Sequence, residues 1–131
     1  LDLICANPDI VVQRGDRLIY CAGALAQLYE TLGGRAVMAG KPFGAIYEAA
    51  LGAASNHMDR PVDPGRVLCI GDGLATDVKG ANRQGLDILF IAGGIHGAEF
   101  AGPDGLDATR VQARLDQEGL AANWAMSDLV W

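Results

Sequence analysis

The chain has 131 residues, 50% of them hydrophobic and 20% charged, which is the composition of a globular domain rather than a disordered segment. Its 16 acidic and 10 basic side chains give a net charge of −6, and the scattered basic residues argue against nucleic-acid binding. No apolar run approaches the roughly 18 residues of a membrane span, so we expect no membrane association.

The first residues bear on whether the chain is a fragment, and the cysteines bear on its cellular compartment. The chain opens with Leu1-Asp2-Leu3-Ile4-Cys5, which resembles the interior of a strand more than a natural start, so we expect a fragment of a longer protein. Cys5, Cys21 and Cys69 form no CxxC pair. This spacing predicts neither a disulfide framework nor a zinc site, and favours small buried thiols in a reducing, cytoplasmic compartment.

Apolar runs alternate with amphipathic stretches, and this alternation predicts an α/β fold, a parallel sheet with flanking helices. The first third of the chain contains a strand candidate, a turn at Asn7-Pro8-Asp9 and then a loop. A helix and a short extended piece follow, the helix ending at Gly33-Gly34. The ranges are Leu1–Cys5 for the strand, Ala22–Leu32 for the helix and Arg35–Ala39 for the extended piece.

In the remainder, the clearest helix runs from Phe43 to Ala54, and its helical spacing of apolar residues predicts one core-facing side. Two continuous apolar runs predict strands buried on both faces. The segment from Trp124 to Trp131 is interpreted as a last strand or turn, with both tryptophans packed on the sheet edge. The predicted strands are Val67–Ile70 and Ile88–Ala92, and the remaining predicted helices are Thr76–Gln84 and Asp107–Glu118.

Two carboxylates follow the first buried strand. Ligands of parallel α/β sheets bind beyond the carboxyl ends of the strands, and Asp72 stands there in Gly71-Asp72-Gly73. Asp77 begins the next helix, so both carboxylates approach one crevice, where a hard cation such as Mg²⁺ would offset their repulsion. The alternative is a Gly-Asp-Gly turn with Asp77 capping the helix.

A lysine opens the long helix. Lys41 lies in Gly40-Lys41-Pro42, where a mobile positive charge and the free N–H groups of a helix start would suit a phosphate. The alternative is an ordinary solvated lysine. Two histidines are weaker candidates: His57 is interpreted as a surface residue at a helix end, and His96 as a loop residue that could edge the crevice.

In this order, the motifs resemble the second half of the haloacid dehalogenase superfamily of phosphohydrolases. Lys41 matches the lysine of the third motif of that superfamily, and Asp72 with Asp77 matches the paired acids of the fourth. Asn7-Pro8-Asp9 and Gly23 add a narrower resemblance to the class IIA branch. That branch includes ribonucleotide monophosphatase-like, 4-nitrophenyl phosphatase-like and pyridoxal phosphatase-like proteins, and the resemblance extends from Leu3 to about Gly94.

The resemblance implies a Rossmann-like core and an inserted α/β cap. Residues 1–38 would be the remainder of the cap, and residues 39–131 the carboxyl-terminal half of the core. The Asp-x-Asp first motif, which carries the nucleophile, and the Ser or Thr second motif have no match here, so both are expected upstream of Leu1. Half a core would leave an uncovered sheet edge, which favours homo-oligomerisation or pairing with the missing amino-terminal portion.

The implied activity is Mg²⁺-dependent hydrolysis of small phosphorylated metabolites, sugar phosphates or nucleotide monophosphates, through an aspartyl-phosphate. In that scheme Asp72 would ligate Mg²⁺, Asp77 would hold a metal-bound water or orient Lys41, and Lys41 would screen charge repulsion. Asn7 and Asp9 would face the active site from the cap and contact the leaving group, unless Asn-Pro-Asp is a plain turn. The alternative for the chain is a non-catalytic α/β binding or regulatory module.

Overall fold

The computed structural model describes residues 1–14, 17–103 and 105–130. The chain divides into two compact units, Leu1–Ala50 and Leu51–Trp131, and each is described by itself. The division falls inside helix α2 (Gly44–His57), the longest helix of the described residues. Within these residues, no helix has the length and apolar character needed to span a bilayer.

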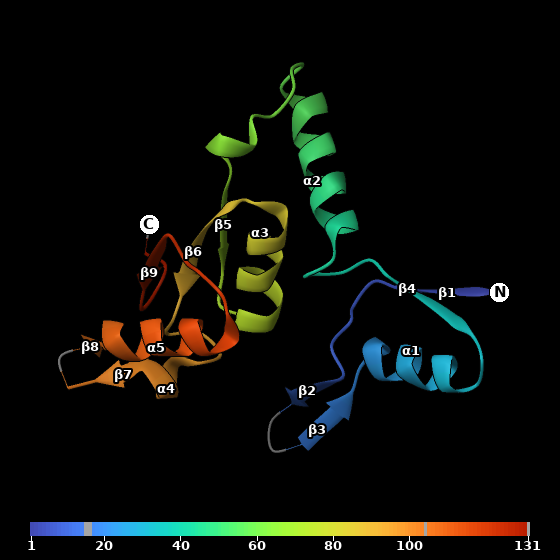
Figure 1. Cartoon of the computed structure of the whole chain (residues 1–131), viewed down its shortest axis with the longest axis horizontal. Helices are drawn as coiled ribbons and strands as arrows, with labels where there is room; N and C mark the ends of the chain where they lie inside the picture. Colours follow the sequence, from blue (N-terminus) through green and yellow to red (C-terminus); the bar gives the residue numbers. More distant parts are fainter. Residues whose placement is uncertain (15–16, 104, 131) are drawn as a thin grey trace. The chain divides into compact units, whose positions relative to one another are not determined.

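The first unit contains a small parallel sheet. Strand β1 (Asp2–Cys5) pairs in parallel with β4 (Arg35–Met38), and helix α1 (Ala22–Thr31) connects them and packs against both (Figure 1). The helix buries Gly23 and Ala26. The strand, the helix and the extended segment predicted from the sequence are therefore confirmed.

The prediction of a loop between this first strand and α1 was wrong. The segment contains a hairpin, in which β2 (Val11–Arg14) pairs antiparallel with β3 (Arg17–Tyr20). Both strands are rich in β-branched, aromatic or long apolar residues, and the dipeptide Gly15-Asp16 between them is a hairpin signal in the sequence. The signal was present, but each strand is only four residues long.

Helix α2 forms as predicted, but the expectation of a core-facing side was wrong. None of its residues is buried: Tyr47, Leu51 and Ala54 are half-buried, and Ile46 is exposed. Apolar spacing predicts that a helix has an apolar face, and it does not reveal whether another element covers that face.

The second unit is built on a three-stranded parallel sheet of order β5-β6-β9, which confirms the α/β class (Figure 1). A π-helical turn, η2, and helix α3 connect β5 to β6, and Gly85, with φ of 65°, ends α3. The residue ranges are β5 (Leu68–Gly71), η2 (Leu74–Val78), α3 (Lys79–Gln84), β6 (Asp87–Ile91) and β9 (Trp124–Met126).

The connection from β6 to β9 contains the predicted carboxyl-terminal helix and two elements that the sequence analysis missed. Helix α5 is capped by Asp107, whose side chain accepts hydrogen bonds from two backbone N–H groups, and it ends at Gly119. A one-turn helix and a short hairpin precede it, and a 3₁₀ turn, η1, precedes β5. The ranges are η1 (Pro64–Arg66), α4 (Gly97–Phe100), β7 (Ala101–Gly102), β8 (Gly105–Leu106) and α5 (Ala108–Glu118).

The core of the second unit lies around β6. Ile88 and Phe90 on this central strand are fully buried, as is Val78 from η2. The rings of Phe90 and Phe100 meet edge to face with centroids 5.7 Å apart. This arrangement stabilises the core in addition to the apolar area that the two rings bury. Ala81 on α3 and Val111 and Leu115 on α5 are buried as well, so this core draws on the strand and on the helical elements of the unit.

Two burial predictions for the sheet were wrong. On β5, Leu68 is 46% exposed and Ile70 is 43% exposed, because these alternate residues share one face of the strand and that face remains open. Trp124 is 55% exposed rather than packed, and Trp131 lies outside the described residues. Of the thiols, Cys5 is buried as predicted, Cys21 and Cys69 are half-buried, and all three are free.

Candidate metal and phosphate site

Asp72 stands at the carboxyl end of the edge strand. Strand β5 ends at Gly71, which is in register with Phe90 of β6, and Asp72 is the next residue. Its carboxylate is half-buried, and Oδ2 accepts a hydrogen bond from the backbone N–H of Ile95 at 3.0 Å. The loop that follows β6 therefore reaches across to this carboxylate.

Asp77 is buried within η2, and its carboxylate braces the loop that carries Asp72. Asp77 Oδ2 accepts from the Gly73 N–H at 3.0 Å, while the Gly73 carbonyl accepts from the N–H groups of Asp77 at 2.8 Å and Val78 at 3.0 Å. A Cβ at Gly71 would overlap the Asp77 carboxylate, so glycine is required there. Asp77 thus lies inside η2 and accepts from the N–H of Gly73, the residue that precedes η2, so the alternative in which Asp77 caps the start of the helix was wrong. This contact is compatible with a metal role.

The charge of Asp77 also affects a titratable group on β5. Burial raises the pKa of the Cys69 thiol above its ordinary value of 9.0, and the negative charge of Asp77 raises it further. The carboxylate therefore lies near enough to the strand to influence a second titratable group.

In the first unit, the structure brings together the other predicted site residues. Asn7 Oδ1 accepts from the Asp9 N–H at 3.1 Å, so Asn7-Pro8-Asp9 does form a turn stabilised by a side chain. A Cβ at Gly40 would overlap the backbone of Ala6, which places the Gly40-Lys41 segment directly against this turn. Gly23 holds the turn in the same way, because a Cβ there would overlap the Pro8 carbonyl oxygen. Lys41 is exposed, and its peptide bond to Pro42 is cis.

The carboxylate oxygens of Asp72 and Asp77, in the second unit, are the type of ligand that Mg²⁺ prefers. The described residues contain no group of three or more His, Cys, Asp or Glu side chains that could hold a metal. Mg²⁺ does not require one, because it binds through one or two carboxylates, substrate phosphate oxygens and several waters. Asp72 and Asp77 could therefore supply the protein's share of such a coordination shell. Asn7, Asp9 and Lys41 belong to the other unit.

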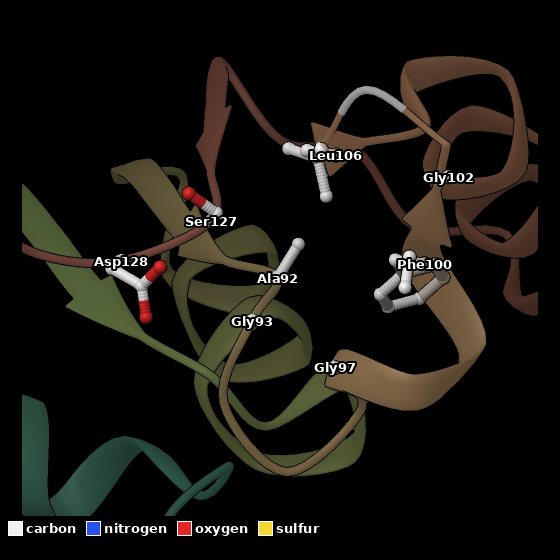
Figure 2. Close-up of a pocket in the computed structure, with 10 residues that line it drawn as sticks. Ala92, Gly93, Gly97, Phe100, Gly102, Leu106, Ser127 and Asp128 are labelled. Atoms are coloured by element: carbon white, nitrogen blue, oxygen red, sulfur yellow. The ribbon is translucent and has the colours of Figure 1, made fainter.

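A cavity of about 390 Å³ lies beyond the carboxyl ends of β6 and β9 (Figure 2). Ala92 and Gly93 contribute one wall, and Ser127 and Asp128, which follow β9, lie across from Leu106 and Phe100. None of the five predicted site residues is among the described residues that line it. The cavity is thus a neighbour of the carboxylate site rather than part of it.

Sequence reasoning missed two residues that contact Asp72, and the structure gives the surroundings of the two histidines. Gly94 and Ile95 contact Asp72, and the sequence analysis assigned neither residue to the site. The available signal was a Gly-Gly pair directly after a strand, which is typical of close backbone approach. His57 is exposed, as predicted, and His96 Nδ1 lies 3.8 Å from Glu99 Oε2.

Comparisons with known proteins support the fold and the family. The chain is 36% identical over 80 residues to chronophin from Bos taurus, covering 60% of this chain and 25% of that protein. It resembles a haloacid dehalogenase-like hydrolase from Brucella suis 1330, with 49% identity, a TM-score of 0.70 and coverage of 99% of this chain and 45% of that one. A double mutant of a thermostable NPPase from Geobacillus stearothermophilus is 29% identical, with a TM-score of 0.59 and coverage of 68% and 34%.

This chain therefore spans less than half the length of each of these relatives. A family model described as HAD-hydrolase-like matches residues 38–115, which is more than half of the chain. The chain belongs to the HAD-like hydrolase family, as the class IIA resemblance of its motifs led us to expect.

Proposed function

We propose that this chain is part of a Mg²⁺-dependent phosphatase that hydrolyses small phosphorylated metabolites of the sugar phosphate or nucleotide monophosphate class. The observation that carries the proposal is the Asp72 carboxylate, held by the Ile95 N–H at the carboxyl end of β5 in a HAD-like fold. The similarity to a thermostable NPPase supports the phosphatase class. Splitting the transfer through an aspartyl-phosphate would follow the family resemblance.

Asp72 and Asp77 would hold the metal ion. Bound Mg²⁺ would neutralise charge on the phosphoryl group during transfer. Asp72 would provide a ligating oxygen, since its observed hydrogen bond uses Oδ2 and the carboxylate has a second oxygen. Asp77 would contribute through a metal-bound water or by orienting Lys41, while its hydrogen bond to the Gly73 N–H keeps the metal-binding loop in shape.

Lys41 and the Asn7 turn would act on the substrate. Lys41, exposed on the loop before α2, would offset the repulsion between an attacking carboxylate and the phosphate dianion. Asn7 Oδ1 is engaged in the turn, so Asn7 would contact a leaving group through its amide nitrogen, with Asp9 beside it. The contacts of Asn7 and Asp9 would select the substrate rather than drive phosphoryl transfer.

The proposed domain division places residues 1–38 in the cap and 39–131 in the core, and the family match, which begins at residue 38, supports it. No carboxylate of this chain is assigned as the nucleophile. We place the attacking aspartate in a part of the whole protein outside residues 1–131, and the coverage of at most 45% of the relatives compared here is consistent with that.

The test of the metal site is Asp72→Asn in the whole protein. The change keeps the side-chain shape but removes a charge from a hard-cation site, so Mg²⁺ affinity and turnover should fall together, each by about tenfold or more. The control is Asp116→Asn, which removes the same charge from an exposed position on α5. Calorimetric Mg²⁺ titration and p-nitrophenyl phosphate kinetics would decide it. Parent-like Mg²⁺ binding and turnover by Asp72→Asn would reduce Gly71-Asp72-Gly73 to a turn.

Lys41→Ala should separate stabilisation of the phosphoryl group from binding of the metal ion. Loss of one preorganised positive group should cost on the order of 3 kcal/mol of transition-state stabilisation, about a hundredfold in rate, with little change in Mg²⁺ affinity. Lys79→Ala, at an exposed position at the start of α3, is the matched control and should behave like the parent. A Lys41→Ala variant that turns over at the parental rate would remove Lys41 from the proposed site.

A further inference from the structure

The loop that joins β6 to α4 is anchored on both sides of the sheet's carboxyl end. On one side, the Gly93 N–H donates to the Ser127 carbonyl at 2.8 Å, which ties the loop to the segment after β9. On the other side, the Ile95 N–H donates to Asp72 Oδ2 at 3.0 Å. The Gly97 N–H closes the turn by donating to the Gly94 carbonyl at 2.9 Å.

Gly94 and Ile95 make two different contacts with the same carboxylate. Ile95 supplies a donor, and hydrogen bonds to an ionised acceptor are short and strong. Gly94 supplies close approach: a Cβ built there would overlap Oδ2, Cβ and Cγ of Asp72, so no other amino acid fits without moving the carboxylate. Together, an attractive and a steric contact from adjacent residues limit where the carboxylate can lie.

We propose that Gly94 and the Ile95 N–H are positioning groups for Asp72, which hold one carboxylate oxygen so that the other is presented to a divalent cation. The inference rests on the proposed function, because it assigns these residues a role at the same metal site. Carboxylates that bind metals are themselves hydrogen-bonded, and loss of such outer partners typically weakens metal binding by 10- to 100-fold, which sets the effect expected here at about that size.

Gly94→Ala in the whole protein tests the steric contact. We expect its Mg²⁺ affinity, measured by calorimetry, to fall by about 10- to 100-fold. Turnover should recover towards the parental kcat at high Mg²⁺, because the ligand is displaced rather than removed. The matched control is Gly97→Ala, three residues along in the same segment, where an added Cβ meets no atom within 4 Å. This control should bind Mg²⁺ like the parent.

A double mutant separates positioning from general damage to the fold. In the Asp72→Asn background, Gly94→Ala should cause little further loss of Mg²⁺ affinity, because both changes act through one carboxylate. Additive losses of affinity, or a Gly94→Ala variant whose Mg²⁺ affinity is within twofold of the parent while that of Asp72→Asn falls, would overturn the inference and leave the proposed function standing. Parent-like Mg²⁺ binding by both single variants would overturn both.

A measurement on the parent protein keeps the inference testable if Gly94→Ala does not fold. The Ile95 amide proton contacts the carboxylate directly, so its NMR signal should shift when Mg²⁺ is added, and the Gly97 amide signal should shift much less. An Ile95 signal that stays in place while Mg²⁺ binds would show that this donor does not sense the ligand, and would overturn the inference.

Discussion

At the scale of single residues, glycines determine how closely the backbone approaches the site. Gly71 and Gly94 lie against the carboxylates of Asp77 and Asp72, and Gly40 lies against the backbone of Ala6. At each position a Cβ would overlap an atom already present. None of the three has a φ in the left-handed region. These glycines are therefore needed for space rather than for backbone conformation.

Cys69 makes the pH dependence of stability testable. Its pKa is raised above 9.0 in the folded state by burial, with a further contribution from Asp77. As the pH rises past 9.0, the thiol of the unfolded chain ionises first, so the free energy of unfolding should fall until the pH passes the folded-state pKa. At a pH below this range, the thiol is protonated in both the folded and the unfolded chain, so Cys69 makes its full contribution to the free energy of unfolding.

The measurement is denaturant unfolding of the whole protein from about pH 8 to pH 10.5, compared with Cys69→Ala. The parent should lose more stability across this window than the variant, since only the parent contains the shifted thiol. Identical pH profiles would show that burial does not perturb Cys69.

Candidate site residues could be chosen from the sequence, whereas their contacts could not be predicted from it. Asp72, Asp77 and Lys41 were identified from short motifs, because few residue types can hold a cation or a phosphate. The contact from Ile95 to Asp72 was not predictable, since it joins residues 23 positions apart through a backbone N–H that has no sequence signature. Motifs therefore indicate candidate side chains, and the structure shows which backbone groups contact them.

At the scale of elements, two asparagines attach the last strand to the sheet. Asn123 Oδ1 accepts from the Ile88 N–H at 2.9 Å, and its Nδ2 donates to Asp87 Oδ1 at 2.8 Å. Asn82 on α3 pairs with the backbone of Ala121, donating to its carbonyl and accepting from its N–H, each at 2.8 Å. The residues before β9 are thus fixed to both β6 and α3 through side-chain amides.

Asn123→Ala should therefore destabilise the protein. It leaves the partly buried Ile88 N–H without its acceptor, at a cost of about 1–3 kcal/mol. Gln112→Ala is the control: it removes an exposed side-chain hydrogen bond to Asp116 within α5, and should change the free energy of unfolding by less than about 0.5 kcal/mol. Equal effects of the two substitutions in denaturant titrations would contradict the role assigned to Asn123.

Elements were predicted best where periodicity and a stop signal agreed. Helix α5 has apolar spacing, an Asp107 cap and a terminal Gly119, and it forms as expected. The hairpin β2–β3 was missed because its strands are short, and the burial of β5 was wrong because a continuous apolar run does not show whether both faces are covered. Local sequence predicts what an element is more reliably than what lies against it.

At the scale of the whole molecule, the second unit leaves apolar surface on its sheet. Leu68 and Ile70 share the open face of β5, and β5 is an edge strand among the described residues. An edge strand offers unpaired backbone groups to another chain, and an apolar face beside it adds a hydrophobic contribution. The prediction of self-association made from the sequence has this surface as its physical basis.

A chain of residues 1–131 alone should therefore associate, and the double substitution Leu68→Thr with Ile70→Thr should reduce the association. Threonine is β-branched, which suits a strand, and it makes the open face more polar. The control is Ile95→Thr, because this residue is 73% exposed but lies on the loop after β6 rather than on the open face of β5. Light scattering over a range of concentrations would measure the result. If Ile95→Thr reduced association as much as the double substitution, exposed apolar area in general would be responsible. If the parent chain stayed monomeric and melted sharply, the open face of the sheet would not drive association at all.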